Sequence, residues 1–119
     1  MIIEQGSLEK IILNALWSLE ENNQPFISVS DIQNLINRET RGRSWAYTTV
    51  KTVLDRLVDK KVILREKQGK KYYYESKVSR ENAGRDAMKK LVENYFNGSF
   101  EEFKEAVNKF EFELIPAYK

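Results

Sequence analysis

The chain has 119 residues, of which 41% are hydrophobic and 32% charged, so it has room for one compact domain or one small domain with an appendage. It contains no cysteine and no histidine, which excludes disulfides, thiol or imidazole catalysis, and metal binding through sulfur or imidazole. We therefore expect no enzyme, no cofactor and no metal. No targeting segment and no run of roughly 20 apolar residues is present, so we expect a cytoplasmic protein without a membrane partner.

The net charge of +2 hides an uneven distribution along the chain. Residues 41–72 carry ten basic and three acidic side chains, a net charge of +7, whereas residues 1–40 carry −4 and residues 73–119 carry −1. A charge run usually serves solubility alone, and it indicates a polyanion-binding surface only where its elements suit a nucleic-acid groove. The secondary structure of this basic block therefore decides its interpretation.

An amphipathic helix is predicted near the start of the chain. Ser7 is a candidate N-cap, and apolar residues recur at helical spacing from Leu8 to Leu19, which predicts a helix ending near Glu21. Leu13 and Trp17 lie four residues apart on another face of this helix. We interpret them as the sign of a second contact, with helices of the same chain or of a second chain.

A second helix is predicted after a loop and a very short strand at residues 26–27. Ser30 is its candidate N-cap, with Val29 just outside as a hydrophobic staple, and the helix is expected to end near Arg38. Residues 39–43 are polar, include Gly42, and indicate a turn or loop.

The third predicted helix, residues 45 to about 60 with Ser44 as N-cap, lies inside the basic block. Its core stripe consists of Val50, Val53, Leu54, Leu57 and Val58. The opposite face mixes short hydroxyls, long cations and one carboxylate: Thr48, Thr49, Lys51, Thr52, Asp55 and Arg56. This face is about 12 Å long, which is comparable to the width of the DNA major groove.

A hairpin with a basic tip is predicted next, with strands at residues 62–67 and 71–75 and a turn at 68–70. Leu64, Tyr72 and Tyr74 are placed where they would cover the helices. Three helices followed by a basic hairpin are the order of a winged helix-turn-helix, in which the third helix enters the major groove and the wing reaches the flanking backbone.

The last third of the chain predicts two further amphipathic helices. Ser79 caps the first, which Asn97-Gly98 ends, and Ser99 with Glu102 forms a capping box for the second. Two such helices cannot form a core alone, so we expect the same helices of two chains to pair, the alternative being that they fold back onto the winged domain. The fold class is thus mainly α with a small β-hairpin, with a winged-helix DNA-binding domain at 1–77 and a helical dimerisation region at 78–119. The candidate dimerisation residues are Leu91, Val92, Tyr95, Phe100, Phe103 and Phe110.

The segment from Ser44 to Lys61, SWAYTTVKTVLDRLVDKK, closely resembles the third-helix signature of the penicillinase-repressor family, the BlaI, MecI and CopY group. The resemblance extends over roughly residues 7–107, through the wing and the FNGSF segment at 96–100. It implies a winged-helix transcriptional repressor that binds an inverted-repeat operator of the TACA and TGTA kind as a homodimer through its C-terminal helices.

Two switches of that family are missing from this chain. Antibiotic-responsive members are cut at an Asn-Phe bond in the last helix, where this chain aligns Ala106-Val107, and copper-responsive members use a C-terminal cysteine cluster. The inducing signal is therefore unknown, and a different protease site, a small ligand and repressor turnover all remain open.

The candidate DNA contacts follow from the exposed face and from the resemblance. The third helix contributes Thr48, Thr49, Lys51, Thr52 and Arg56, and the flanking loops contribute Arg41, Arg43, Lys70 and Lys71. The threonines suit base edges and thymine methyls, whereas the loop cations suit phosphates. We expect Asp55 to pair internally with Lys51 or Arg56, rather than to accept from cytosine, and Trp45 to join the core.

The sequence leaves two other functions open beside a sequence-specific repressor. Some winged helices are protein-interaction adaptors that do not bind DNA, although such a surface would more often show an apolar patch than threonines and cations. A nonspecific architectural DNA binder is the third possibility, and the expected pairing of two hydroxyl-rich helices argues against it.

Overall fold

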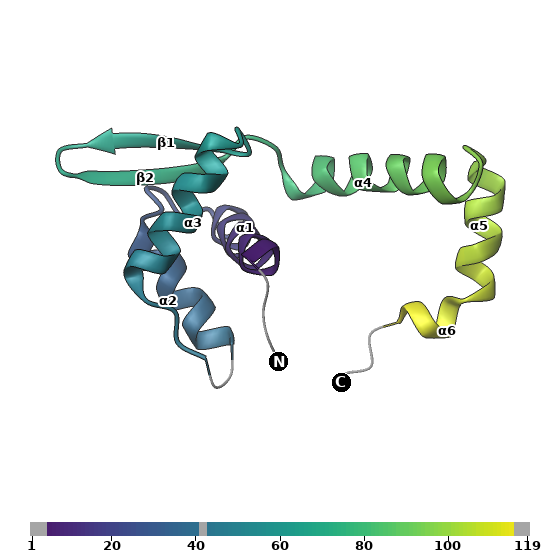
Figure 1. Ribbon diagram of the computed structural model, residues 1–119, viewed down its shortest axis with the longest axis horizontal. Helices are drawn as coiled ribbons and strands as arrows, with labels where there is room; N and C mark the ends of the chain where they lie inside the picture. Colours follow the sequence, from purple (N-terminus) through teal and green to yellow (C-terminus); the bar gives the residue numbers. More distant parts are fainter. Residues whose placement is uncertain (1–4, 41–42, 116–119) are drawn as a thin grey trace. The chain divides into compact units, whose positions relative to one another are not determined.

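The computed structural model describes residues 5–40 and 43–115. The chain divides into two compact units, Met1–Arg80 and Glu81–Lys119, which we call the winged unit and the C-terminal unit. The described elements are α1 (Gln5–Glu21), α2 (Val29–Glu39), α3 (Tyr47–Asp59), β1 (Ile63–Gln68), β2 (Lys71–Ser76), α4 (Arg80–Tyr95), α5 (Phe100–Lys109) and α6 (Glu111–Leu114) (Figure 1). The expected mainly helical fold with one small hairpin is confirmed.

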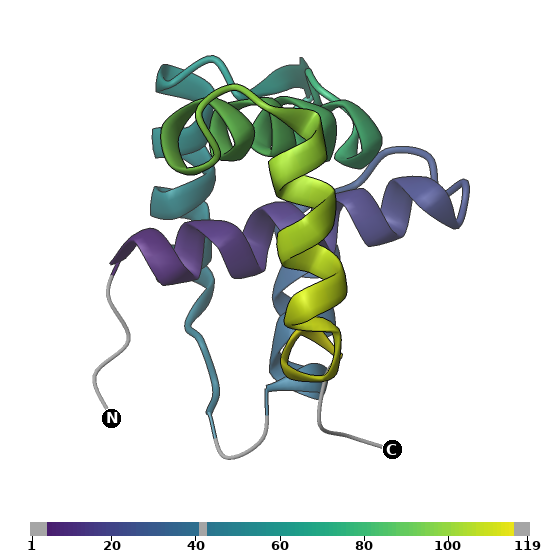
Figure 2. The ribbon, with the colours of Figure 1, turned by 90° about the vertical axis from the view of Figure 1, so that its right-hand side faces the viewer.

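The winged unit is built around one apolar core. Helix α1 lies across α2 and α3, seen end-on in Figure 1 and from the side in Figure 2. The core consists of Leu8, Ile12, Ala15, Leu16, Ile27, Val29, Ile32, Leu35, Ile36, Val50, Val53, Leu54, Leu57, Ile63 and Tyr74. Every helix and both strands of this unit contribute to it, so burial of these side chains fixes the three helices and the hairpin against one another.

The hairpin is antiparallel, and Arg65 lies opposite Tyr74 while Lys67 lies opposite Tyr72. Because side chains alternate along a strand, the faces that carry Tyr74 and Ile63 turn toward the helices, and Leu64 turns outward with 45% of its surface exposed. Tyr72 and Tyr74 cover the helices as predicted. The prediction for Leu64 is wrong, because its neighbour Ile63 faces the helices instead.

Backbone geometry constrains the chain at the hairpin turn and at residues 26–27. Gly69 has a φ of 64° and takes the first position of a two-residue turn, where a left-handed residue matches the twist of the strands. The short strand expected at residues 26–27 is a single bridge, in which the Tyr74 backbone N–H donates to the Ile27 carbonyl at 2.8 Å.

Three predicted helix starts are wrong. Helix α1 begins at Gln5, before Ser7, and α3 begins at Tyr47, three residues after Ser44. Helix α2 is capped by Ser28 rather than Ser30: the Ser28 hydroxyl accepts from the Asp31 backbone at 3.2 Å, and the Asp31 carboxylate accepts from the Ser28 backbone at 2.9 Å.

The position of the α2 cap has a tertiary cause. Ile27 is held against Tyr74 by the bridge, and Val29 is buried in the core, so the chain turns into the helix between them. Val29 is therefore the first residue of α2, not a staple outside it. The side chain of Gln33, which would complete a box with Ser30, donates instead to the Trp45 carbonyl at 3.0 Å.

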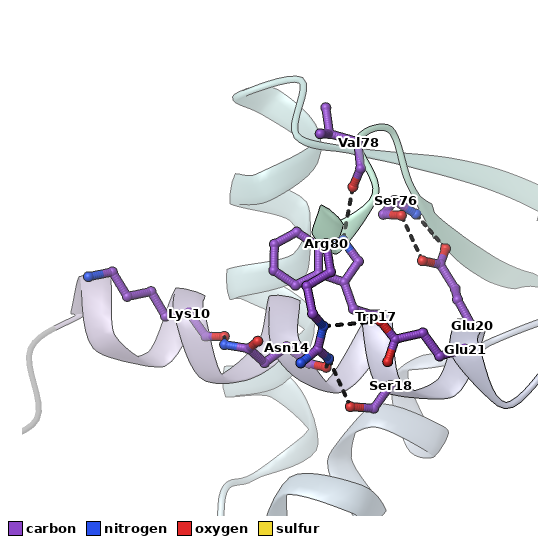
Figure 3. A network of polar contacts seen from close by, with 9 residues as sticks. All are labelled: Lys10, Asn14, Trp17, Ser18, Glu20, Glu21, Ser76, Val78 and Arg80. Carbon is purple, nitrogen blue, oxygen red and sulfur yellow. Dashed lines mark hydrogen bonds and ion pairs between the residues drawn. The ribbon is translucent and has the colours of Figure 1, made fainter. Parts of the chain in front are cut away.

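The segment that leaves the wing is attached to α1 by polar contacts (Figure 3). The Ser76 backbone N–H and hydroxyl donate to the Glu20 carboxylate at 2.7 and 2.6 Å, and the Trp17 indole donates to the Val78 carbonyl at 2.9 Å. Arg80 lies over the Trp17 ring and pairs with Glu21 at 3.1 Å. The second contact expected for Trp17 is thus made, within the winged unit, by residues 78–80 of the same chain.

The C-terminal unit turns sharply between α4 and α5. Asn97 and Gly98 both have left-handed backbone, with φ of 55° and 70°, and they end α4 where the sequence predicted. The Ser99 hydroxyl accepts from the Glu102 backbone N–H at 3.1 Å, which is one half of the expected capping box of α5. The other half is not formed, because the Ser99 N–H donates to the Phe96 carbonyl at 2.8 Å and the Glu102 carboxylate accepts from the Asn97 amide at 3.2 Å. Helix α5 ends at Lys109, so Phe110 lies at the junction with α6 and not inside the helix.

Candidate nucleic-acid interface

Helix α3 presents a polar face to solvent. Its Val50, Val53, Leu54 and Leu57 side chains are buried, which turns the opposite side of the helix outward. Thr48, Thr49 and Thr52 are exposed on that side, and within residues 5–40 and 43–115 none of their hydroxyls has a hydrogen-bond partner. Their hydroxyl and methyl groups are available to an outside partner, as a base-reading role requires.

The N-terminal end of α3 carries no cap. Ala46 occupies the N-cap position without a side-chain acceptor, and the first turn contains no acidic residue. The first intrahelical bond runs from the Val50 N–H to the Ala46 carbonyl at 3.1 Å, which leaves the N–H groups of the preceding turn without an intrahelical acceptor. Together with the helix dipole, these donors favour an anion at this end of the helix.

The segment before α3 is fixed to α2 by side chains of α2. The Asn37 amide oxygen accepts from the Trp45 backbone N–H at 2.7 Å, and the amides of Asn37 and Gln33 both donate to the Trp45 carbonyl. The Trp45 ring is half-buried against the core, as expected, and Arg43 lies over it at 4.6 Å. These bonds set the angle between α2 and α3 and so determine where the polar face points.

A charged cluster joins α3 to the wing. Asp55 accepts from Lys51 at 2.9 Å, one turn earlier on α3, and from Arg65 of β1 at 2.8 Å. The Arg65 guanidinium also lies 4.6 Å from the centre of the Tyr72 ring. The internal pair of Asp55 with Lys51 is confirmed, while the second pair, with Arg65, was missed in the sequence.

Strand alternation was the signal that could have found Arg65. It lies on the same face as Ile63 and Tyr74, both of which are buried, so its side chain starts from the helix-facing side of the strand and reaches Asp55, while 33% of the side chain stays exposed. The cluster couples the two elements that would touch DNA, because Lys51 on α3 and Arg65 on the wing share one carboxylate. A displacement of the wing therefore disturbs the polar face of α3.

Two ionisation equilibria are shifted near this cluster. The hydrogen bond from Lys51 to Asp55 raises the pKa of Lys51 above its ordinary value of 10.5, which keeps the ammonium charged. Burial raises the pKa of Tyr74 above its ordinary value of 10.0, which keeps the phenol neutral. The helix-facing side of the wing thus holds a fixed positive charge beside a neutral hydroxyl.

The other predicted DNA contacts in the described residues lie at the wing turn, on α3 and just before α3. Lys70 and Lys71 are exposed at the wing turn and make no ion pair within the described part of the chain, while Arg56 of α3 is half-buried. Arg43 stands before α3, and Arg41 lies outside the described residues. Lys60, another cation of the basic block, is engaged by Glu9 of α1 at 2.8 Å.

The candidate dimerisation residues form an apolar surface on the C-terminal unit. No described residue of α4, α5 or α6 is buried, and Tyr95 and Phe100 are 76% and 61% exposed. Phe103 is half-buried, with its ring 5.5 Å from that of Phe96 and 6.4 Å from that of Phe100. A hollow of about 370 Å³ lies beside it, lined by Met88, Val92, Phe100 and Phe103 among others. Of the six candidate residues, Val92 and Phe103 are half-buried in the single chain, and the other four are exposed.

The described residues contain neither a metal-binding cluster nor a membrane-spanning helix. Over the described ranges, no group of three or more acidic side chains is arranged to hold a metal ion. None of the helices described is long and apolar enough to cross a bilayer.

Comparison with known proteins places this geometry in a family. The model of the penicillinase repressor family matches residues 5–111, which includes the winged unit and α4 and α5. No curated protein matches the chain. Members of this family are DNA-binding transcriptional regulators and not enzymes. The chain, with its polar third helix and basic wing, belongs to the penicillinase repressor family.

Proposed function

We propose that the protein is a sequence-specific transcriptional repressor that binds an inverted-repeat operator as a homodimer. Residues 1–77 would bind the DNA, with α3 in the major groove and the wing on the flanking backbone, and residues 78–119 would hold the two chains together. The observation that carries this proposal is the face of α3, where three exposed threonines follow an uncapped helix end.

The threonines and the lysines have different roles in this proposal. Thr48, Thr49 and Thr52 would read base edges and thymine methyls, because their short side chains lie on the face that enters the groove. Lys51 and Arg56 would reach guanine or phosphate. Arg41, Arg43, Lys70 and Lys71 would bind phosphates, since loop cations follow the backbone and carry no sequence information.

Pairing of two chains is required by the symmetry of an inverted repeat. Two copies of α3 would occupy half-sites one helical turn apart, and a two-fold axis through the C-terminal helices would relate them. This role is supported by apolar residues that no described residue of the single chain buries: Leu91, Val92, Tyr95, Phe100, Phe103 and Phe110, of which Val92 and Phe103 are half-buried and the others exposed.

The test is DNA binding measured by fluorescence anisotropy on two duplexes of equal length, an inverted repeat of the TACA and TGTA kind and a scrambled sequence, across a salt series. We expect a preference for the operator of roughly a thousandfold or more. Equal binding to both duplexes would indicate a nonspecific binder or a different operator. Absence of binding at low salt would favour the protein-interaction adaptor.

A matched pair of variants locates base reading on α3. Thr49→Ala should weaken operator binding by roughly tenfold and leave scrambled binding unchanged, because a base contact acts on one sequence only. Thr40→Ala, at the C-terminal end of α2 and outside the proposed interface, is the control and should change neither affinity.

A further inference from the structure

A small cavity lies in the winged unit, between the N-terminal ends of α2 and α3 and the wing. Its volume is about 260 Å³. The lining includes three lysines and three tyrosines: Lys51, Lys70, Lys71, Tyr47, Tyr72 and Tyr74. A cavity of this size is near the lower limit of small-molecule sites, so it suits a compact ligand.

One of the lining residues, Tyr74, carries a buried hydroxyl without a hydrogen-bond partner among the described residues. Tyr74 is 3% exposed, and no hydrogen-bond partner for its hydroxyl exists within the part of the chain that the structure describes. Buried polar groups in folded proteins are nearly always paired, so each exception needs an explanation. A ligand atom inside the cavity would supply the missing partner, because Tyr74 belongs to the lining.

The charge around the cavity selects an anion. Lys51, Lys70 and Lys71 bring three ammonium groups to the lining. Among the described residues that line the cavity there is no carboxylate, and Asp55, which pairs with Lys51, is shared with Arg65. The cavity therefore combines an excess of positive charge with a hydroxyl donor, a set that fits phosphate oxygens.

We propose that this cavity binds the phosphate group of a small phosphorylated molecule and that its occupation competes with DNA. The competition rests on the proposed DNA-binding function, since Lys51, Lys70 and Lys71 are also proposed DNA contacts and cannot neutralise two polyanions at once. Binding of the phosphate group itself does not rest on that function. A phosphate of the DNA backbone presents the same chemistry, and the experiment distinguishes the two sources.

The first arm titrates pyrophosphate, and separately inorganic phosphate, into the full chain at constant ionic strength and follows the heat of binding. Pyrophosphate should bind saturably, and Tyr74→Phe should weaken it by about tenfold because the phenol would donate to a charged oxygen. Tyr73→Phe is the matched control, since Tyr73 lies on the outward face of the same strand, and it should keep the wild-type affinity. Tyr74→Phe removes only a buried, unpaired hydroxyl, so it should fold with an unfolding midpoint at neutral pH that is equal to or higher than that of the wild type.

The second arm adds the operator duplex. Saturating pyrophosphate should weaken operator binding, and the concentration that halves it should rise about tenfold in Tyr74→Phe. Saturable binding of pyrophosphate without any duplex binding would support the cavity and overturn the repressor function. The proposal would be overturned if pyrophosphate did not bind saturably, or if Tyr74→Phe and Tyr73→Phe lost the same amount of pyrophosphate affinity. If Tyr74→Phe weakens duplex binding while pyrophosphate does not bind, the site belongs to the DNA backbone and the small-molecule proposal is overturned.

Discussion

The winged unit and the C-terminal unit use apolar residues in opposite ways. In the winged unit, α1, α2, α3 and the hairpin direct their apolar side chains into one shared core, and Ile12, Leu16 and Leu54 are fully buried. In the C-terminal unit, α5 is as clearly amphipathic as α2, yet no described residue of α4, α5 or α6 is buried. An apolar face in the first unit stabilises the fold, whereas in the second it remains available for another surface.

This difference predicts two kinds of stability in one chain. Unfolding of the winged unit should be independent of protein concentration, because its core is contributed by one chain. Order in the C-terminal unit should depend on concentration, because its apolar stripe is completed by a second chain in the proposed homodimer.

The largest effect is expected from the core of the winged unit. Leu54→Ala removes a fully buried side chain of α3 and should lower the free energy of unfolding by about 2–5 kcal/mol, since it combines lost burial with a cavity. Urea unfolding at two protein concentrations measures it, and the loss should be the same at both. Thr52→Ala on the exposed face of the same helix is the control and should change stability by less than about 0.5 kcal/mol.

The second effect is expected in the C-terminal unit. Phe103→Ala removes the ring that contacts Phe96 and Phe100. It should raise the dissociation constant of the dimer at least thirtyfold, which is a loss of about 2 kcal/mol in association free energy, because we place this ring at the centre of the interface. Sedimentation over a concentration series measures it. Phe112→Ala in α6, outside the proposed dimerisation residues, is the aromatic control. A dimer that persists in Phe103→Ala at micromolar concentration would remove Phe103 from the interface.

A smaller effect is expected from the wing. The double variant Lys70→Ala and Lys71→Ala should weaken operator and scrambled duplex alike, because phosphate contacts carry no sequence information. The slope of log affinity against log salt should fall in magnitude by about 2, close to one unit for each lost phosphate contact. Loss of operator binding alone, with scrambled binding intact, would mean that the wing reads bases and would move part of the specificity away from α3.

Most of the fold could be predicted from the sequence because periodicity reports burial directly. The spacing of Val50, Val53, Leu54 and Leu57 predicts one buried face, and the structure buries all four. Helix starts were less predictable, since Ser28 and Ser30 are chemically equivalent caps. The choice between them depends on the bridge between Ile27 and Tyr74, a contact between residues far apart in the sequence.

The candidate interface was predictable in composition but not in connectivity. The polar face of α3 and the cations of the wing follow from residue types and helical spacing. The shared use of Asp55 by Lys51 and Arg65 does not, because it depends on how the hairpin packs against α3. The cavity beneath the wing turn was missed for the same reason: Lys70, Tyr47 and Tyr74 meet only in the folded chain.

The smallest effect is expected from alkaline pH, and it tests how tightly the wing is packed on the helices. Burial raises the pKa of Tyr74 above 10.0, and the hydrogen bond to Asp55 raises the pKa of Lys51 above 10.5. Above these ordinary values the unfolded chain releases protons that the folded chain retains, so stability falls as the pH rises toward the folded-state pKa of each group.

Thermal unfolding from pH 8 to pH 11 should show a falling midpoint, and Tyr74→Phe should reduce the fall because it removes one of the two groups. Tyr73→Phe should leave the alkaline loss intact. An identical pH dependence in Tyr74→Phe and the wild type would mean that water reaches the Tyr74 hydroxyl and that the wing separates from the helices more readily than its packing indicates.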